Sequence, residues 1–173
     1  MSWAERLQKR INEPRATCLP APREELNGLL NEAINMAVKL IEQHGNHIPF
    51  CFAITFAGER TDIAADDTKI RDPDLLFESV RQRTLESIRT LRLRAVALAR
   101  NVRFHRPTDP EPRDAVQVTL DHLSDSARTC YLPYRVVDGR VVADELFATD
   151  PVERLIADKA TFIAGSAGEV KGR

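Results

Sequence analysis

Residues 114–147 constrain the fold of this chain most, because apolar and polar residues alternate there around two turn signals. Alternation with a period of two is typical of strands that bury one face. A polar tip at residues 124–126 separates two such runs, and Asp138-Gly139 between paired valines is the strongest short-range signal for a β-hairpin. The segment therefore predicts an antiparallel meander. Its alternating apolar residues are Val116, Val118 and Leu120 in the first run and Cys130, Leu132, Tyr134 and Val136 in the second.

Two other stretches have the period of a helix. From Arg23 onward, apolar residues recur every three or four positions, and Gly45 has the place of a residue that ends a helix. Gly28, inside this stretch, weakens the helix by about 1 kcal/mol relative to alanine, or else permits close packing. Asp72-Pro73 is an N-cap residue followed by proline, which predicts the start of a second helix that ends near Leu93.

The remaining strands are expected on either side of the second helix. Residues 49–56 alternate phenylalanine and isoleucine with small residues, so one strand face is bulky and the opposite face can lie under a helix. A weaker strand is expected at residues 61–65, and a longer one from about Leu93 to His105. Short terminal helices are expected at residues 3–11 and after Asp150-Pro151, where Val152, Leu155 and Ile156 form the apolar side.

This order of elements predicts an α+β fold with a central antiparallel sheet of about five or six strands and two main helices packed on it. The order looks like that of roadblock or profilin proteins, a comparison that carries no function. We expect an N-terminal helix and proline-containing arm at residues 1–22, a single domain at 23–160 and a flexible tail at 161–173.

The composition favours a soluble cytoplasmic protein. A net charge of −1 with 29% charged residues predicts no general affinity for nucleic acids. The three cysteines, Cys18, Cys51 and Cys130, form no disulfide framework, which favours a reducing compartment. The first fifteen residues lack the apolar core of a signal peptide, and the longest apolar run, residues 48–57, is too short to cross a membrane.

Three segments resemble a family of small bacterial proteins that is frequent in actinobacteria. The matching residues are Ile48-Pro49-Phe50 through Gly58-Glu59, Asp114-Ala115-Val116 through Asp121-His122, and Leu132-Pro133-Tyr134-Arg135. The resemblance covers most of residues 26–147. It departs from the family pattern at Asp121, where glutamate is usual, and at residues 123–126, which replace a tighter glycine turn. The family has no established activity, so the resemblance implies no catalytic residues.

Few residues have the spacing that chemistry requires. His44, His47 and Cys51 lie close together in the sequence, but a metal needs three or four converging ligands, so we expect neither a metal nor a cofactor. Asp121 and His122 are adjacent on a strand and therefore point to opposite faces. We expect His122 to be a hydrogen-bonded histidine at the edge of the core.

A cysteine mechanism stays open as an alternative. Cys130 is the candidate nucleophile if His122 lies across the hairpin from it, and Tyr134 would lie beside it on the same face. Glu59 would join this site if the first predicted hairpin lies next to it.

The second predicted helix and the strand after it are rich in arginine. Eight arginines lie at residues 81–106 with Glu86 as the single acid, and Arg81, Arg89 and Arg92 share one flank of the helical stripe. We expect them to pair with acids of the fold or of a second copy, because stacking aromatics are missing from the stripe. Nucleic-acid binding is therefore the least expected function.

The segment Leu132-Pro133-Tyr134-Arg135 places a proline within a strand pattern. Proline lacks the ladder donor, so this strand is expected to be bulged there or to lie at a sheet edge, where chains can associate. We therefore expect a non-enzymatic interaction or regulatory module that forms a homodimer. The alternatives are a small-molecule binding protein or cysteine/histidine enzyme with a pocket at the end of the sheet, and an immunity or antitoxin partner of another bacterial protein.

Overall fold

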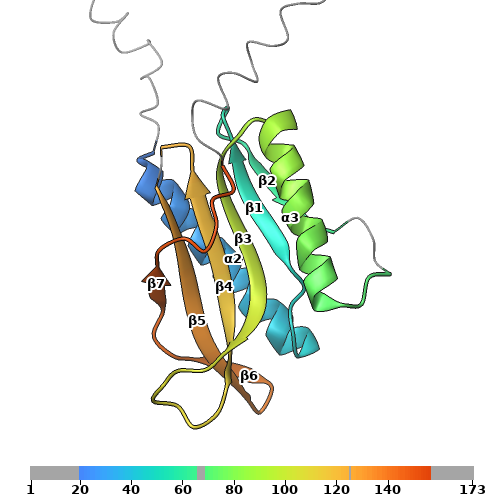
Figure 1. Ribbon diagram of the computed structural model, residues 1–173, viewed down its shortest axis with the longest axis vertical. Helices are drawn as coiled ribbons and strands as arrows, with labels where there is room; N and C mark the ends of the chain where they lie inside the picture. The colour runs from blue at the N-terminus through green and yellow to red at the C-terminus, as the bar shows by residue number, and fades with distance from the viewer. Residues whose placement is uncertain (1–19, 66–68, 125, 157–173) are drawn as a thin grey trace, which may run out of the picture.

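A computed structural model describes residues 20–65, 69–124 and 126–156. This part of the chain forms two helices and seven strands (Figure 1). The elements are α2 (Pro22–His44), β1 (Phe50–Thr55), β2 (Arg60–Ile63), α3 (Pro73–Thr90), β3 (Leu93–Phe104), β4 (Arg113–His122), β5 (Ala127–Val137), β6 (Arg140–Ala143) and β7 (Phe147–Thr149). The strands pair in the order β2-β1-β3-β4-β5-β6, every pair is antiparallel, and β7 also pairs with β5. The predicted α+β class is confirmed.

Both main helices begin at the predicted signals, and α2 also ends at one. Pro22 lies in the first turn of α2, and Gly45 ends the helix with a left-handed φ of 78°, its N–H bonded to the Ile41 carbonyl at 2.7 Å. The Asp72 carboxylate caps α3 by accepting hydrogen bonds from the N–H groups of Asp74 and Leu75 at 2.9 and 3.2 Å.

The predicted hairpin joins β5 to β6. Asp138 and Gly139 have φ values of 51° and 74°, the positive values that a two-residue hairpin turn with matched strand twist requires. Val136 then pairs with Val141 across the hairpin. The Asp138-Gly139 signal therefore predicted this hairpin correctly.

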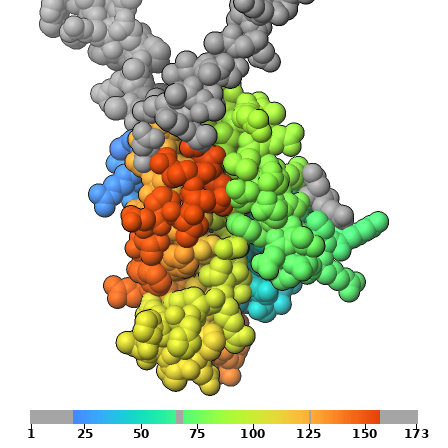
Figure 2. Space-filling model, viewed as in Figure 1, coloured from blue at the N-terminus to red at the C-terminus, as the bar shows by residue number. Residues whose placement is uncertain are grey.

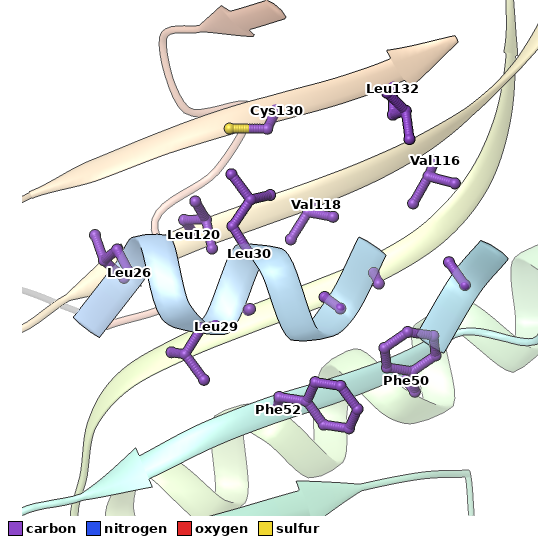
Figure 3. Close-up of a cluster of buried hydrophobic side chains, with 14 of the residues drawn as sticks. Leu26, Leu29, Leu30, Phe50, Phe52, Val116, Val118, Leu120, Cys130 and Leu132 are labelled. Atoms are coloured by element: carbon purple, nitrogen blue, oxygen red, sulfur yellow. The ribbon is translucent and has the colours of Figure 1, made fainter. Parts of the chain in front are cut away.

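The two helices pack on opposite faces of the sheet. Helix α2 lies behind the sheet in Figure 1 and covers the bulky face of β1 together with the alternating apolar residues of β4 and β5. Figure 3 shows this core, in which the leucines of α2 lie over side chains from β1, β4 and β5. Its labelled members are Leu26, Leu29, Leu30, Phe50, Phe52, Val116, Val118, Leu120, Cys130 and Leu132.

The other face is covered partly by α3 and partly by the C-terminal segment. Val80 and Ile88 of α3 pack on the small residues Cys51 and Ala53 of β1, as the sequence predicts. The segment after β7 crosses the face beside α3 (red-orange in Figure 2) and buries Leu155 and Ile156 in the same cluster.

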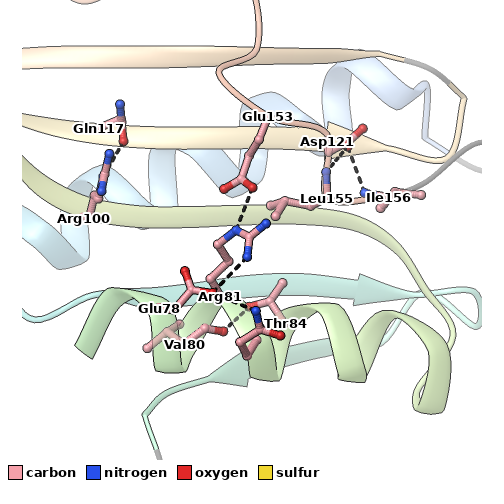
Figure 4. A network of polar contacts seen from close by, with 11 residues as sticks. Glu78, Val80, Arg81, Thr84, Arg100, Gln117, Asp121, Glu153, Leu155 and Ile156 are labelled. Atoms are coloured by element: carbon pink, nitrogen blue, oxygen red, sulfur yellow. Dashed lines mark hydrogen bonds and ion pairs between the residues drawn. The ribbon is translucent and has the colours of Figure 1, made fainter. Parts of the chain in front are cut away.

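The sequence predicts a helix after Asp150-Pro151. This prediction is wrong over the described residues, because residues 151–156 have no helical turn. The reason is the buried Asp121 carboxylate on β4, which binds the backbone N–H groups of Leu155 and Ile156 at 2.8 and 3.0 Å (Figure 4). The expected helix at residues 3–11 lies outside the described residues. None of the helices over the described ranges is both long enough and apolar enough to cross a membrane.

Candidate ligand-binding site

Three ionisable side chains from three elements meet under the first turns of α2. The Glu25 carboxylate accepts hydrogen bonds from Nε of Arg94 at 3.2 Å, from Nη2 of the same guanidinium, and from Nε2 of His122 at 3.0 Å. The side chains of Glu25, Arg94 and His122 are 5%, 11% and 9% exposed. Burying charges at this depth is unfavourable unless they are paired, so the three groups form one unit that joins α2 to β3 and β4. We call them the Glu25 cluster.

A β-bulge directs Arg94 into this cluster. Ala95 pairs with Ile54 and Leu93 pairs with Thr55, so Arg94 has no counterpart on β1. The extra residue breaks the strict alternation, and Ala95 packs on the α2 side although Leu93 packs on the α3 side. A further hydrogen bond from Nη1 of Arg94 to the Phe56 carbonyl at 3.0 Å holds the guanidinium in place.

The backbone determines which nitrogen of His122 carries the proton. The N–H of Ser124 donates to Nδ1 of His122 at 3.0 Å, so Nδ1 is an acceptor and Nε2–H donates to Glu25. Both ring nitrogens of His122 are thus hydrogen-bonded. Its neighbour Asp121 points to the opposite face, as the alternation of a strand requires.

A cavity of about 420 Å³ opens beside the Glu25 cluster, between the start of α2 and the β1–β2 hairpin. This volume falls in the range of about 300–1,000 Å³ typical of small-molecule sites. Its wall combines charged groups with apolar ones: Pro20, Glu24, Glu25, Gly28, Leu29, Glu32, Ile54, Gly58, Arg60 and Arg94.

Gly28 is the least expected residue of this wall. It lies in the interior of α2, where glycine costs about 1 kcal/mol relative to alanine. A Cβ atom added there would meet no heavy atom within 4 Å, so close packing does not account for it. Gly28 faces the cavity, and its missing side chain leaves that space open.

The mouth of the cavity is crossed by an ion pair between two elements. Arg60 of β2 binds Glu32 of α2, and the two side chains are 35% and 55% exposed. The Arg60 guanidinium also lies 5.7 Å from the centroid of the Phe52 ring. Gly58, with φ 87°, makes the turn between β1 and β2, and a Cβ atom on it would lie 3.7 Å from Nη2 of Arg94.

The residues of the cysteine alternative do not converge. Cys130 pairs with Val118 and His122 pairs with Ala95, four residues further along β4, so the histidine and the thiol are about 13 Å apart along the strand. Burial raises the pKa of Cys130 although Arg128 beside it acts in the opposite direction. Tyr134 is buried, donates to the Asn101 side chain at 2.8 Å, and has its pKa raised by burial to about 12. Glu59 is exposed in the turn after β1.

The expected edge surface at residues 132–135 is mostly interior. Leu132 and Tyr134 point into the α2 core, whereas Arg135 is exposed. Pro133 lies where β7 has ended and β6 has not begun, so its missing N–H interrupts neither ladder. Strands β6 and β7 cover most of the edge of β5.

The three arginines expected on one flank of the second helix have separate environments, and Arg92 lies beyond the end of α3, so it does not share that flank. Arg81 binds Glu153 of the C-terminal segment at 2.7 Å and Glu78 of its own helix at 3.1 Å (Figure 4). Arg92 has a left-handed φ of 53°, and its guanidinium lies 5.3 Å from the centroid of the Phe56 ring. Arg89 is exposed in the last turn of α3.

His44, His47 and Cys51 also have separate environments. His44 is exposed at the end of α2, and Cys51 lies in the α3-side core, where burial raises its pKa to about 12. His47 is buried, its Nδ1 lies 3.1 Å from the Ile48 carbonyl, and burial lowers its pKa. No set of three His, Cys, Asp or Glu side chains suited to a metal occurs within the described ranges.

Sequence reasoning missed Glu25 and Arg94. An acid in the first turn of a helix is usually an exposed partner of the helix dipole, and an arginine in an arginine-rich stretch is usually solvated. The bulge that buries Arg94 has no local sequence signal. Gly28 was the one feature of the sequence that pointed to this site, because a glycine in a helix interior lowers the stability of the helix.

Comparison of the chain with protein-family models, curated proteins and solved structures finds no match. The resemblance to small bacterial proteins therefore stays a prediction.

Proposed function

We propose that this chain is a small-molecule binding protein whose ligand occupies the cavity between α2 and the β1–β2 hairpin. The single observation that carries the proposal is Gly28, a helix-interior glycine that faces open space beside a buried charged cluster. A sequence under selection for stability alone gains by replacing such a glycine with alanine. A ligand that needs the space accounts for a glycine at this position.

The chemistry of the wall supports binding in preference to covalent catalysis. Ser, Thr, Cys and Lys are missing from the described residues that line the cavity, so a hydroxyl, thiol or amine nucleophile is missing from this wall. The acids and bases nearest the cavity floor already bind one another. A wall of this kind orients a bound ligand and contributes to its affinity.

A fragment screen by 15N NMR tests the proposal. We expect bound fragments to shift the amide resonances of Gly28, Gly58 and Ile54, which line the cavity from three segments. The variant Gly28→Leu would place a good helix-forming side chain in part of the cavity and should weaken these shifts without unfolding the protein. Shifts that are unchanged in the variant, or that fall elsewhere, would refute the proposal.

A second candidate function is self-association through the β5–β6 hairpin. Val137 and Val142 are 50% and 43% exposed and are diagonal neighbours on one side of the hairpin. Arg135 and Arg140 flank them on the same side. Two exposed valines on a projecting hairpin favour a homodimer contact over a purely solvated surface.

Sedimentation velocity of the native protein and of Val142→Lys tests this second candidate. A dimer that the substitution converts to a monomer would support it. A native protein that stays monomeric at high concentration would rule it out.

A further inference from the structure

The geometry points to the class of ligand: a small carboxylate with an apolar body, whose head group lies between Arg94 and Arg60. This inference rests on the proposed function and assigns the chemistry of the same cavity.

The spare hydrogen-bonding capacity at the floor of the cavity consists mainly of donors. Glu25 already accepts three hydrogen bonds, and both nitrogens of His122 are bonded. Arg94 uses one hydrogen of Nη1 for Phe56 and one of Nη2 for Glu25, so each terminal nitrogen keeps a second N–H. A ligand that reaches the floor must therefore present acceptor atoms.

A second cation at the mouth favours a charged acceptor over a neutral one. The positive charge of Arg94 is balanced by Glu25, so the floor alone would suit a neutral carbonyl group. Arg60 is partly exposed and is held at the mouth by Glu32, a carboxylate of the protein itself. A ligand carboxylate would replace Glu32 at Arg60 and bind Arg94 with its other oxygen. Glu32 is more than half exposed, so its release into water costs little.

The remaining acid of the wall acts weakly on the ligand. Glu24 lies on the exposed side of the first turn of α2, where solvent and salt screen its charge. The rest of the wall is apolar, with Leu29 from α2 and Ile54 from β1 facing the same space. An alkyl or aromatic body fits between them once Gly28 leaves room.

NMR titration with hexanoate, hexanamide and hexylamine tests the inference, because the three probes share one alkyl chain and differ in the head group. We expect hexanoate to bind most tightly and hexylamine least, as read from the amide shifts of Gly28 and Gly58. Arg60→Gln should weaken hexanoate about tenfold, whereas hexylamine should not be weakened, because the substitution removes a positive charge and releases the Glu32 carboxylate. Glu32→Gln should strengthen hexanoate, because it removes the competing carboxylate. Both positions are partly exposed, so neither variant threatens the fold.

These titrations distinguish a wrong ligand class from a wrong binding site. If hexylamine binds most tightly, or if Arg60→Gln and Glu32→Gln leave the affinity for hexanoate unchanged, the carboxylate class is wrong while the cavity remains a binding site. If none of the three probes shifts Gly28 or Gly58 in the native protein, and a broader fragment screen also fails there, the proposed function itself is wrong.

Discussion

Gly28 is the residue at which stability and the proposed ligand binding oppose each other. We expect Gly28→Ala to raise the free energy of unfolding by about 1 kcal/mol, because the helix gains propensity and the new methyl group meets no heavy atom. Urea denaturation measures the change. The same substitution at Gly45, where φ is 78°, should instead lower the stability, because a left-handed residue with a Cβ atom is strained. A loss of stability at Gly28 would mean that its neighbourhood is closed.

The thiols give a second test at the residue scale. Burial raises the pKa of Cys51 to about 12 and also raises that of Cys130, so neither thiolate is populated near neutral pH. We expect both to resist brief alkylation between pH 5 and 9 and to react only after unfolding. Site-resolved mass spectrometry separates them from Cys18. Rapid labelling of Cys130 in the native protein at pH 7 would restore the cysteine mechanism.

His47 predicts a pH dependence of stability. Burial lowers its pKa below the ordinary value of 6.5, so the unfolded chain takes up the proton before the folded one does. The contribution of His47 to stability is therefore present above pH 6.5 and is lost as the pH falls through the folded pKa. We expect His47→Gln to flatten this part of the stability profile, whereas His105→Gln, at an exposed position, should leave it unchanged.

At the scale of elements, one carboxylate holds the C-terminal segment against the sheet. Asp121 is fully buried and accepts hydrogen bonds from Arg154 as well as from the backbone of Leu155 and Ile156. Asp121→Asn places an amide N–H₂ against donors and should cost on the order of 3 kcal/mol. The amide hydrogens of Leu155 and Ile156 should then exchange faster with solvent.

Glu153→Gln provides the matched control for this element. It weakens the ion pair with Arg81, whose side chains are 28% and 24% exposed, so a loss of at most about 1 kcal/mol is expected. Equal losses from Asp121→Asn and Glu153→Gln would contradict the account of how this segment is held.

At the scale of the whole molecule, local patterns predicted the elements and missed the contacts between them. The Asp138-Gly139 turn, the Asp72 cap and Gly45 act within a few residues, so their signals are complete in the sequence. The alternation in β4 and β5 predicted which residues share the buried face for the same reason, and the structure places α2 on that face.

The Glu25 cluster and the path of the C-terminal segment depend on long-range contacts. Glu25 meets Arg94 across 69 residues and His122 across 97, and a bulge without sequence signal decides where Arg94 points. Residues 151–156 carry a good helix start, but the N–H groups of Leu155 and Ile156 bind Asp121, and the segment is not helical. Helix propensity is weaker than a buried carboxylate with several donors.

A crystal structure of the protein soaked with hexanoate tests the central claim most directly. The account predicts density for the ligand between α2 and the β1–β2 hairpin, with the carboxylate bound to Arg94 and with Glu32 displaced from Arg60. A cavity that stays filled by water alone at saturating hexanoate, or a carboxylate bound only at another surface, would contradict it.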